Sequence, residues 1–501
     1  MNDKRIIKNT IILYFRMIFQ MIVYLYTSRV VINALGFVDY GIYDVVGSVV
    51  IAMMFLNNSM LNCTQRYITF TLAENDDAKL CNVFSHALLM HILLGICIVI
   101  AGAIAGTFYI QEFMVLPSGK VDDALFVFYV ALASAFVTIV SVPYNAMIIA
   151  HEHMGAFALI TIVDVVLKLI VALSLFLFGH DRLRMYALLL LAAALIVRII
   201  YGVYCHRAYR NVRFTPEFDR NLFKNMLGFL GWNTIGNTAV MCNTQGLNLM
   251  LNAVGGPVVN AARGLAFQVQ TATVSFINSF QTAINPQIIK NCAVKDYIKM
   301  NSLVLVSSRV SFLLMLFITV PLMLMTENLL TIWVSEYPDY TPVFVRLLLC
   351  VSIVETVANP LMVGASATGN IKKYQLLVGG CMLCTMPLAF MALRSGAEPQ
   401  AVFWALLATT LLAQAVRMLL CRGLFGFSSA DFLVKVLVPL FKVCAVCVVP
   451  LVLLRECYED SGLTGTLLTC VAIDVWVAIC VFALGLTSSE RDFVLKKIRV
   501  R

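Results

Sequence analysis

Apolar runs of about twenty residues recur from one end of the chain to the other, and they constrain the fold more than any other feature. Each run is long enough to cross the hydrocarbon of a bilayer as a helix. Helices are expected throughout because lipid offers no hydrogen-bond partner to an exposed strand edge. Charged residues make up only 13% of the 501 positions, about half the usual share. We therefore predict an all-α polytopic membrane protein.

The apolar runs predict about 14 transmembrane helices. The first run, from Thr10 to about Val31, is too long for a signal-peptide core and lacks a small-residue cleavage site. It therefore counts as the first span. The predicted spans cover residues 10–32, 41–63, 83–108, 124–149, 155–178, 185–205, 226–252, 258–284, 301–325, 343–365, 374–393, 400–420, 433–454 and 463–486.

The longest basic connection, residues 206–225, follows the sixth predicted span. It divides twelve spans into two sets of six and leaves the last two as an appended pair. Two six-helix lobes around a central cavity are typical of duplicated transporters. The predicted parts are an N-terminal lobe (1–206), a basic cytoplasmic linker (207–225), a C-terminal lobe (226–421), the additional helices 13 and 14 (433–486) and a basic cytoplasmic tail (487–501).

The net charge of +9 does not indicate a nucleic-acid partner, because the basic residues gather at alternate ends of the predicted spans. Cytoplasmic connections of membrane proteins are enriched in Lys and Arg. If the N-terminus is cytoplasmic, the inner connections hold most of these residues. The outer connections then hold only Lys120, Arg182, Arg184, Arg394 and Arg455. Both termini are therefore predicted to be cytoplasmic.

Polar side chains form stripes on four of the predicted spans. Span one carries Arg16, Gln20, Thr27, Ser28 and Arg29. Span two carries Asp44, Ser48, Asn57, Asn58 and Asn62. Span seven carries Asn233, Asn237, Thr244, Asn248 and Asn252. Span eight carries Thr271, Ser275, Asn278, Thr282 and Asn285, with Gln270 nearby. Many of these residues are four apart, so they share a helix face. The first pair of helices in each half would then line one cavity; alternatively, single Asn residues join helices by hydrogen bonds.

Arg29 and Arg263 lie within about three turns of the predicted outer face, one in each half. A charge in the hydrocarbon is costly, so each should be buried in protein, wetted by a cavity or used to hold a ligand. The guanidinium stays charged, and its forked donors match phosphate oxygens. We therefore predict that both bind a phosphate or pyrophosphate, with Asp44 balancing Arg29. A structural role for either arginine is the alternative.

Other intramembrane charges have different predicted roles. Asp164 and Lys168 are four residues apart and should form a structural ion pair, with a proton relay as the alternative. Lys442 and Asp474 both come near the midplane of the last two spans, and we predict that they pair. Glu355 is deep in span ten without an obvious partner, which makes it a candidate for coupling to H⁺ or Na⁺.

No cofactor or metal site is predicted. The fifteen cysteines lie mostly within apolar runs and are expected to be small buried hydrophobes. The CxxC pairs Cys381–Cys384 and Cys444–Cys447 fall mid-span without a nearby His or second pair, so a metal or redox site is the weaker interpretation. No nucleotide-binding glycine loop or nucleophile–base pair indicates an enzyme.

Several short motifs, in their order and placement, resemble the Wzx-type polysaccharide and O-antigen flippases of the multidrug/oligosaccharidyl-lipid/polysaccharide (MOP) exporter superfamily. The motifs are Ser28-Arg29-Val30-Val31, Leu35-Gly36, Asp39-Tyr40-Gly41-Ile42-Tyr43, Gln65-Arg66-Tyr67-Ile68, Trp232, Asn243-Thr244-Gln245-Gly246, Gly256-Pro257, Asn260-Ala261-Ala262-Arg263-Gly264, Asn285-Pro286-Gln287-Ile288-Ile289-Lys290 and Gly369-Asn370-Ile371-Lys372-Lys373-Tyr374. The resemblance covers nearly the whole chain.

This resemblance implies a fold like that of the multidrug and toxic-compound extrusion (MATE) transporters. It also implies translocation of an undecaprenyl-pyrophosphate-linked oligosaccharide, an O-antigen or capsule repeat unit, from the cytoplasmic to the periplasmic leaflet of a bacterial inner membrane. Arg29 and Arg263 fall where related lipid II flippases place functional arginines, and Arg66 would contact substrate at the inner mouth. Membrane lipids and the polysaccharide polymerase machinery are the other implied partners.

Two rival functions belong to the same superfamily. The expected span count of about 14 matches lipid II flippases, whereas many Wzx-type proteins have twelve. A multidrug or cation antiporter is the other rival, but such proteins often bind cations with buried acidic residues, and the cavity candidates here are mostly basic.

Overall fold

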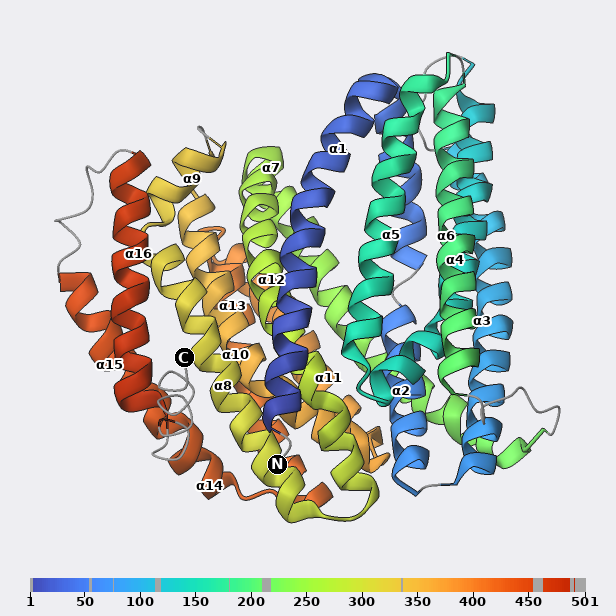
Figure 1. Ribbon diagram of the computed structural model, residues 1–501. Coiled ribbons are helices and arrows are strands. Elements are labelled where there is room, and N and C mark those ends of the chain that lie inside the picture. The colour runs from blue at the N-terminus through green and yellow to red at the C-terminus, as the bar shows by residue number, and fades with distance from the viewer. Residues whose placement is uncertain are drawn as a thin grey trace, which may run out of the picture. The chain divides into compact units, whose positions relative to one another are not determined.

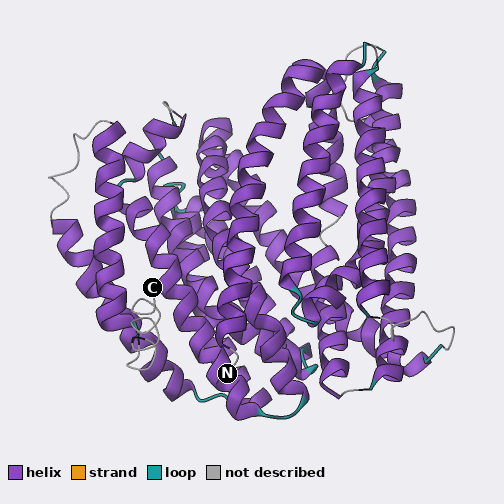
Figure 2. Ribbon diagram, viewed as in Figure 1, coloured by secondary structure: helices purple, strands orange, loops and turns teal. Residues whose placement is uncertain are grey.

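A computed structural model describes residues 3–53, 56–74, 76–112, 119–179, 181–209, 218–334, 337–453, 463–486 and 491. The regular elements in these ranges are all helices, and no strand occurs among them (Figure 2). Ten of the described helices are long and apolar enough to cross a membrane. The prediction of an all-α polytopic chain is therefore confirmed.

The chain divides into two compact units, Met1–Asn237 and Thr238–Arg501. The helices of the first unit (Figure 1) are α1 (Asp3–Met53), α2 (Leu56–Glu74), α3 (Asp77–Glu112), α4 (Val121–Ala150), α5 (Met154–Ser174), the short 3₁₀ helix η1 (Leu175–Leu177), α6 (Arg182–Ala208) and the beginning of α7 (Arg220–Ala293).

Helix α4 is central to the first unit, since it packs against α2, α3 and α6, while α1 packs against α5. One apolar core gathers around Ile68, Phe84 and Met147, and another gathers around Val46 and Phe128. At Gly106, α3 approaches α4 so closely that an added Cβ would lie 2.0 Å from the Phe128 ring. Small residues at such crossings allow membrane helices to pack tightly.

Gly36 breaks α1 into two helical arms. Its φ of 78° lies in the left-handed region, which a glycine adopts without the steric cost of a side chain. The predicted spans 10–32 and 41–63 both begin within α1, and the break at Gly36 lies between them. Contacts with neighbouring segments surround it: Arg182 donates to the Ala34 carbonyl at 2.9 Å, and Lys120 pairs with Asp39 at 2.8 Å.

The second unit contains the rest of α7 and the helices that follow it. They are α8 (Tyr297–Leu324), α9 (Thr326–Val334), α10 (Thr341–Thr368), α11 (Lys372–Leu383), α12 (Thr385–Arg394), α13 (Ala401–Phe425), α14 (Ser429–Phe432), the π-helix η2 (Leu433–Leu437), α15 (Val438–Leu453), α16 (Leu463–Cys480) and the π-helix η4 (Val481–Gly485). Helix α10 packs against both α8 and α13, and α13 also contacts α11 and α12. Leu251, Ala262, Phe344 and Phe403 belong to the apolar core that joins α7, α10 and α13.

Helix α7 holds two membrane spans rather than one. Its 74 residues would extend about 111 Å as a straight rod, more than twice the thickness of a bilayer. However, the guanidinium of Arg263 donates a hydrogen bond to the carbonyl oxygen of Thr244 at 2.8 Å, although the two residues are 19 apart. A straight helix would separate them by about 28 Å. The chain therefore reverses between them, as the predicted spans 226–252 and 258–284 require.

The last two helices, α15 and α16, pack against each other and against α8. The prediction that Lys442 pairs with Asp474 is wrong. The Lys442 side chain is exposed, and the buried Oδ1 of Asp474 has no hydrogen-bond partner in the described part of the chain. Instead, the Trp476 indole donates to the Cys447 carbonyl at 3.3 Å. The prediction rested on membrane depth alone, and equal depth does not place two side chains on the facing sides of neighbouring helices.

Candidate functional site

Arg263 lies on the second arm of the α7 hairpin and is half-buried. One of its terminal nitrogens donates to the Thr244 carbonyl at 2.8 Å, and its guanidinium lies 5.5 Å from the centre of the Phe267 ring. A guanidinium has five N–H donors in a planar fork. Because the described residues engage only one donor in a hydrogen bond, the others remain for an anionic ligand.

The second arm of α7 also has a polar face that is exposed in the second unit. Thr271, Ser275 and Asn278 are all exposed. The Thr271 and Ser275 hydroxyls donate to carbonyls one turn earlier, at 2.8 and 2.7 Å. The amide of Asn278 has no side-chain hydrogen bond among the described residues, so it is free to bind a hydroxyl-rich ligand.

Two of the predicted cavity residues make interhelical hydrogen bonds in the structure. Within the first unit, the Asn237 amide donates to the Ser59 hydroxyl of α2 at 2.6 Å. Within the second unit, the Gln270 amide donates to the Ser352 hydroxyl of α10 at 2.9 Å. Hydrogen bonds of this kind hold membrane helices together. Asn248 is half-buried and has no side-chain hydrogen bond in the described part of the chain.

Arg29 lies on the first arm of α1 in the first unit. Its side chain is exposed and has no hydrogen bond or ion pair among the described residues. The neighbouring Tyr24 and Tyr26 side chains are also exposed, at 72% and 54%. The Asp44 side chain, predicted to balance Arg29, lies outside the described residues. Arg29 is thus an accessible cation on a membrane helix.

Aromatic rings surround Arg66, the predicted inner-mouth residue. Its guanidinium lies 5.0 Å from the centres of the Tyr67 and Phe229 rings and 5.6 Å from that of Phe70. Cation–π contacts of this kind stabilise a guanidinium by about 0.5–2 kcal/mol each. The rings therefore hold Arg66 in place, a role that sequence reasoning missed although Phe70 lies four residues further along α2.

Glu355 has a cationic neighbour that the sequence analysis did not find. It is exposed on α10, and the guanidinium of Arg417 on α13 interacts with it electrostatically. Arg417 lies within α13, and only 9% of its surface is exposed. Among the described residues, its Nε and Nη1 atoms have no hydrogen-bond partner, and neither do the two amide atoms of Gln414 one turn earlier. Arg417 therefore provides positive charge inside the second unit beside a carboxylate.

A hydrogen-bonded network joins α7, α8 and α10 beside Glu355. The Gln281 amide donates at 3.0 Å both to the Ser311 hydroxyl and to the Thr356 carbonyl, and the Asn359 amide donates to the Gln281 carbonyl oxygen. Satisfied polar networks of this kind make a buried site rigid. The network fixes the part of α10 that carries Glu355.

Asp164 and Lys168 form the predicted ion pair on α5, at 2.8 Å. The Lys168 side chain is 50% exposed. An exposed pair of residues four apart stabilises a helix by only about 0.3–0.5 kcal/mol. The geometry favours the structural interpretation over a proton relay.

The loop between α4 and α5 has an aromatic cluster. The rings of His151 and Tyr209 stack with centres 4.0 Å apart, and the Tyr209 hydroxyl lies 2.9 Å from Nδ1 of His153. Burial lowers the pKa of His151, and the nearby His153 lowers it further. No group of three or more His, Cys, Asp or Glu residues that could hold a metal ion occurs in the described ranges.

Comparison with known proteins identifies the family of this chain. The polysaccharide biosynthesis protein family matches residues 4–292, which is more than half of the 501 positions. The chain belongs to the polysaccharide biosynthesis protein family. This assignment confirms the resemblance drawn from the motifs in and around spans one, two, seven and eight.

Solved structures similar to this polysaccharide biosynthesis protein are transporters of the MOP superfamily. A MATE structure in the straight conformation has a TM-score of 0.73 at 15% identity, covering 84% of this chain and 95% of its own. An outward-facing MATE multidrug resistance transporter has a TM-score of 0.69 at 15% identity, with 83% and 95% covered. No curated protein sequence gives a significant match.

A MOP superfamily transporter from Pyrococcus furiosus also shares the fold, with a TM-score of 0.69 at 15% identity and 85% and 96% of the two chains covered. The reverse polarity of the binding pocket in that Pyrococcus furiosus transporter suggests a different function for it. At this identity the likeness shows the fold, and the expectation of a MATE-like fold is confirmed. The polysaccharide biosynthesis protein is therefore a multi-pass membrane protein of transporter fold.

Proposed function

We propose that this protein is a flippase that moves an undecaprenyl-pyrophosphate-linked oligosaccharide, such as an O-antigen or capsule repeat unit, across the bacterial cytoplasmic membrane. Transport would proceed by alternating access, with both termini cytoplasmic. Membership of the polysaccharide biosynthesis family and the transporter fold support this assignment. The product would pass to the polysaccharide polymerase machinery.

The observation that carries the proposal is the state of Arg263. It is a half-buried guanidinium on a membrane hairpin, anchored by one hydrogen bond and with its other donors unengaged. A pyrophosphate cannot cross hydrocarbon unaided, and a guanidinium binds phosphate oxygens through two parallel hydrogen bonds. Arg263 and Arg29 would bind the pyrophosphate, and the exposed Asn278 amide would bind glycan hydroxyls.

Glu355 would couple transport to H⁺ or Na⁺. A carboxylate within a membrane helix is costly unless it has a function or a counter-charge. The Arg417 guanidinium supplies counter-charge, and the Gln281 network holds the backbone of α10 beside Glu355. Cation binding to Glu355 would then change the electrostatic balance within the second unit during each cycle.

A cation or drug antiporter is the second candidate function, and the exposed Glu355 favours it. The MATE fold is compatible with that activity. A flippase substrate carries an anionic pyrophosphate, whereas an antiporter of this kind would carry a cation. The positive charges of Arg29 and Arg263 therefore favour the flippase. An organic cation would be repelled by the two guanidinium groups.

Complementation of a strain that lacks its own O-unit flippase tests the proposal. The wild-type protein should restore surface polysaccharide, and Arg29→Ala and Arg263→Ala should not. Arg394→Ala is the matched control, because Arg394 is an exposed arginine on the same predicted side of the membrane. If both variants export as well as the control does, the role of the arginines as phosphate ligands is refuted.

A further inference from the structure

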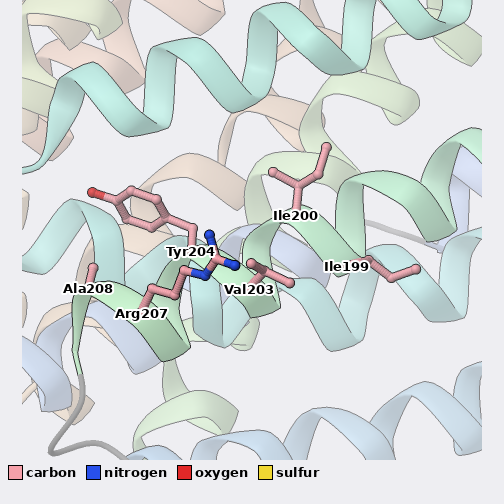
Figure 3. Close-up of a pocket in the computed structure, with 6 residues that line it drawn as sticks. All are labelled: Ile199, Ile200, Val203, Tyr204, Arg207 and Ala208. Carbon is pink, nitrogen blue, oxygen red and sulfur yellow. The ribbon is translucent and has the colours of Figure 1, made fainter.

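The surface of α6 has a hollow of about 480 Å³ at the C-terminal end of the helix. Its lining residues are Ile199, Ile200, Val203, Tyr204, Arg207 and Ala208 (Figure 3). A hollow of this size is within the range that holds small ligands. We call it the α6 groove.

One end of the α6 groove is apolar and accessible. Ile199 is 61% exposed and Val203 is 46% exposed. One turn before them, Leu195 and Ile196 are exposed at 45% and 44%. The apolar strip therefore continues along α6 towards the middle of the predicted span 185–205, where hydrocarbon chains would cover it.

The other end of the groove is polar and cationic. Figure 3 shows the Tyr204 ring at the end opposite Ile199, and the Arg207 side chain extending from that end so that its guanidinium lies beside Val203. Arg207 is exposed, and no carboxylate pairs with it among the described residues. The Tyr204 hydroxyl lies 3.3 Å from Nδ1 of His153, which fixes the ring at the rim. Tyr and Arg side chains at a helix end are typical of the membrane–water interface.

The charge and its position specify the occupant. The predicted orientation places the C-terminal end of α6 at the cytoplasmic face, where anionic lipids concentrate. A phosphate group would lie beside Arg207, and an acyl chain would follow Ile199 and Val203. We propose that the α6 groove binds an anionic glycerophospholipid of the cytoplasmic leaflet. The proposal is independent of the transported substrate, since it rests on α6 alone.

Native mass spectrometry of the purified full chain, titrated with phosphatidylglycerol or phosphatidylcholine, tests this inference. The wild-type protein should retain phosphatidylglycerol preferentially. Arg207→Gln should lower that retention about tenfold, as expected when a charge-assisted hydrogen bond is lost. Val203→Trp, which fills the apolar end without changing charge, should lower retention of both lipids.

Arg220→Gln is the matched control, because Arg220 is an exposed arginine at the start of α7 and does not line the groove. It should bind phosphatidylglycerol as the wild-type protein does. Equal retention of phosphatidylglycerol by wild type, Arg207→Gln and Val203→Trp would overturn the proposal. The proposal would also be overturned if the protein bound a prenyl pyrophosphate at the α6 groove and phosphatidylglycerol did not compete with it. That result would assign the groove to the lipid-linked substrate.

Discussion

Arg263 donates a hydrogen bond to the main-chain carbonyl of Thr244 at 2.8 Å, and this bond joins the two arms of α7. The same guanidinium that we assign to pyrophosphate binding therefore also anchors the hairpin. Arg263 therefore has both a structural role and a proposed binding role. The acceptor is a backbone oxygen, so the hydrogen bond cannot be removed by a substitution at Thr244. A substitution of Arg263 has to be tested for stability as well as for transport.

Arg263→Ala should lower the melting temperature of the purified protein as well as transport. Loss of a hydrogen bond from a charged donor costs about 1.5–3 kcal/mol. Arg263→Lys keeps the charge and one bond to Thr244, so it should recover most of the stability but lack the forked geometry for phosphate. Thermal unfolding in detergent measures the first effect. An unchanged melting temperature in Arg263→Ala would show that the bond to Thr244 contributes nothing.

Glu355 and Arg417 should behave as an energetically coupled pair. Arg417→Gln leaves the carboxylate without its counter-charge, whereas the double variant Glu355→Gln/Arg417→Gln removes both charges. The effects of the single substitutions should therefore be non-additive by about 0.5–3 kcal/mol, measured as a double-mutant cycle on thermal unfolding. Asp164→Asn with Lys168→Gln is the control cycle, and this exposed pair should give about 0.5 kcal/mol or less. Additive effects at Glu355 and Arg417 would show that they are not coupled.

Gly106→Ala should destabilise the first unit. The new Cβ would lie 2.0 Å from a carbon atom of the Phe128 ring, so α3 and α4 would have to separate. Overpacking of this kind costs about 1–3 kcal/mol. Gly155→Ala is the control, because a Cβ there has no heavy atom within 4 Å. The melting temperature should fall only for Gly106→Ala, and equal values for the two variants would contradict the close approach of α3 and α4.

Acidification should destabilise the loop between α4 and α5. Burial lowers the pKa of His151 in the folded protein below its usual value of 6.5. The unfolded state then binds more protons than the folded state between these two pKa values, so stability is lost as pH falls below about 6.5. His151→Gln removes this contribution. The melting temperature of the wild type should drop more between pH 7.5 and pH 5.5 than that of His151→Gln, and parallel decreases would contradict the prediction.

The length of the apolar runs was sufficient to predict the long helices, including the reversal between Thr244 and Arg263, but not the short helix α9. Side-chain partners were harder to predict, because helical periodicity shows which residues share a face but not which helix that face contacts. Asn237 and Gln270 were thus predicted to line a cavity, whereas they bond to Ser59 and Ser352. The Lys442–Asp474 pair was wrong because it was predicted from membrane depth alone, which does not show which side of a helix a residue lies on.

Arg417 shows a second limit of sequence reasoning. It lies near the end of the predicted span 400–420, a position that does not indicate whether its side chain is buried. In the structure Arg417 is buried on α13, where it interacts electrostatically with the Glu355 carboxylate and with the fully buried Tyr374. These residues are far apart in the sequence, so no local pattern could reveal their contact.

Translocation in proteoliposomes tests the central claim most directly. Vesicles containing the purified protein would carry a fluorescent prenyl-pyrophosphate-linked oligosaccharide, and the fraction reaching the opposite leaflet would be followed over time. The wild type and Arg394→Ala should accelerate translocation, and Arg29→Gln and Arg263→Gln should each slow it about tenfold or more, as expected when a charge-assisted hydrogen bond to phosphate is lost. Equal rates for wild type and both variants, or transport of an organic cation with no movement of the lipid-linked oligosaccharide, would contradict the account.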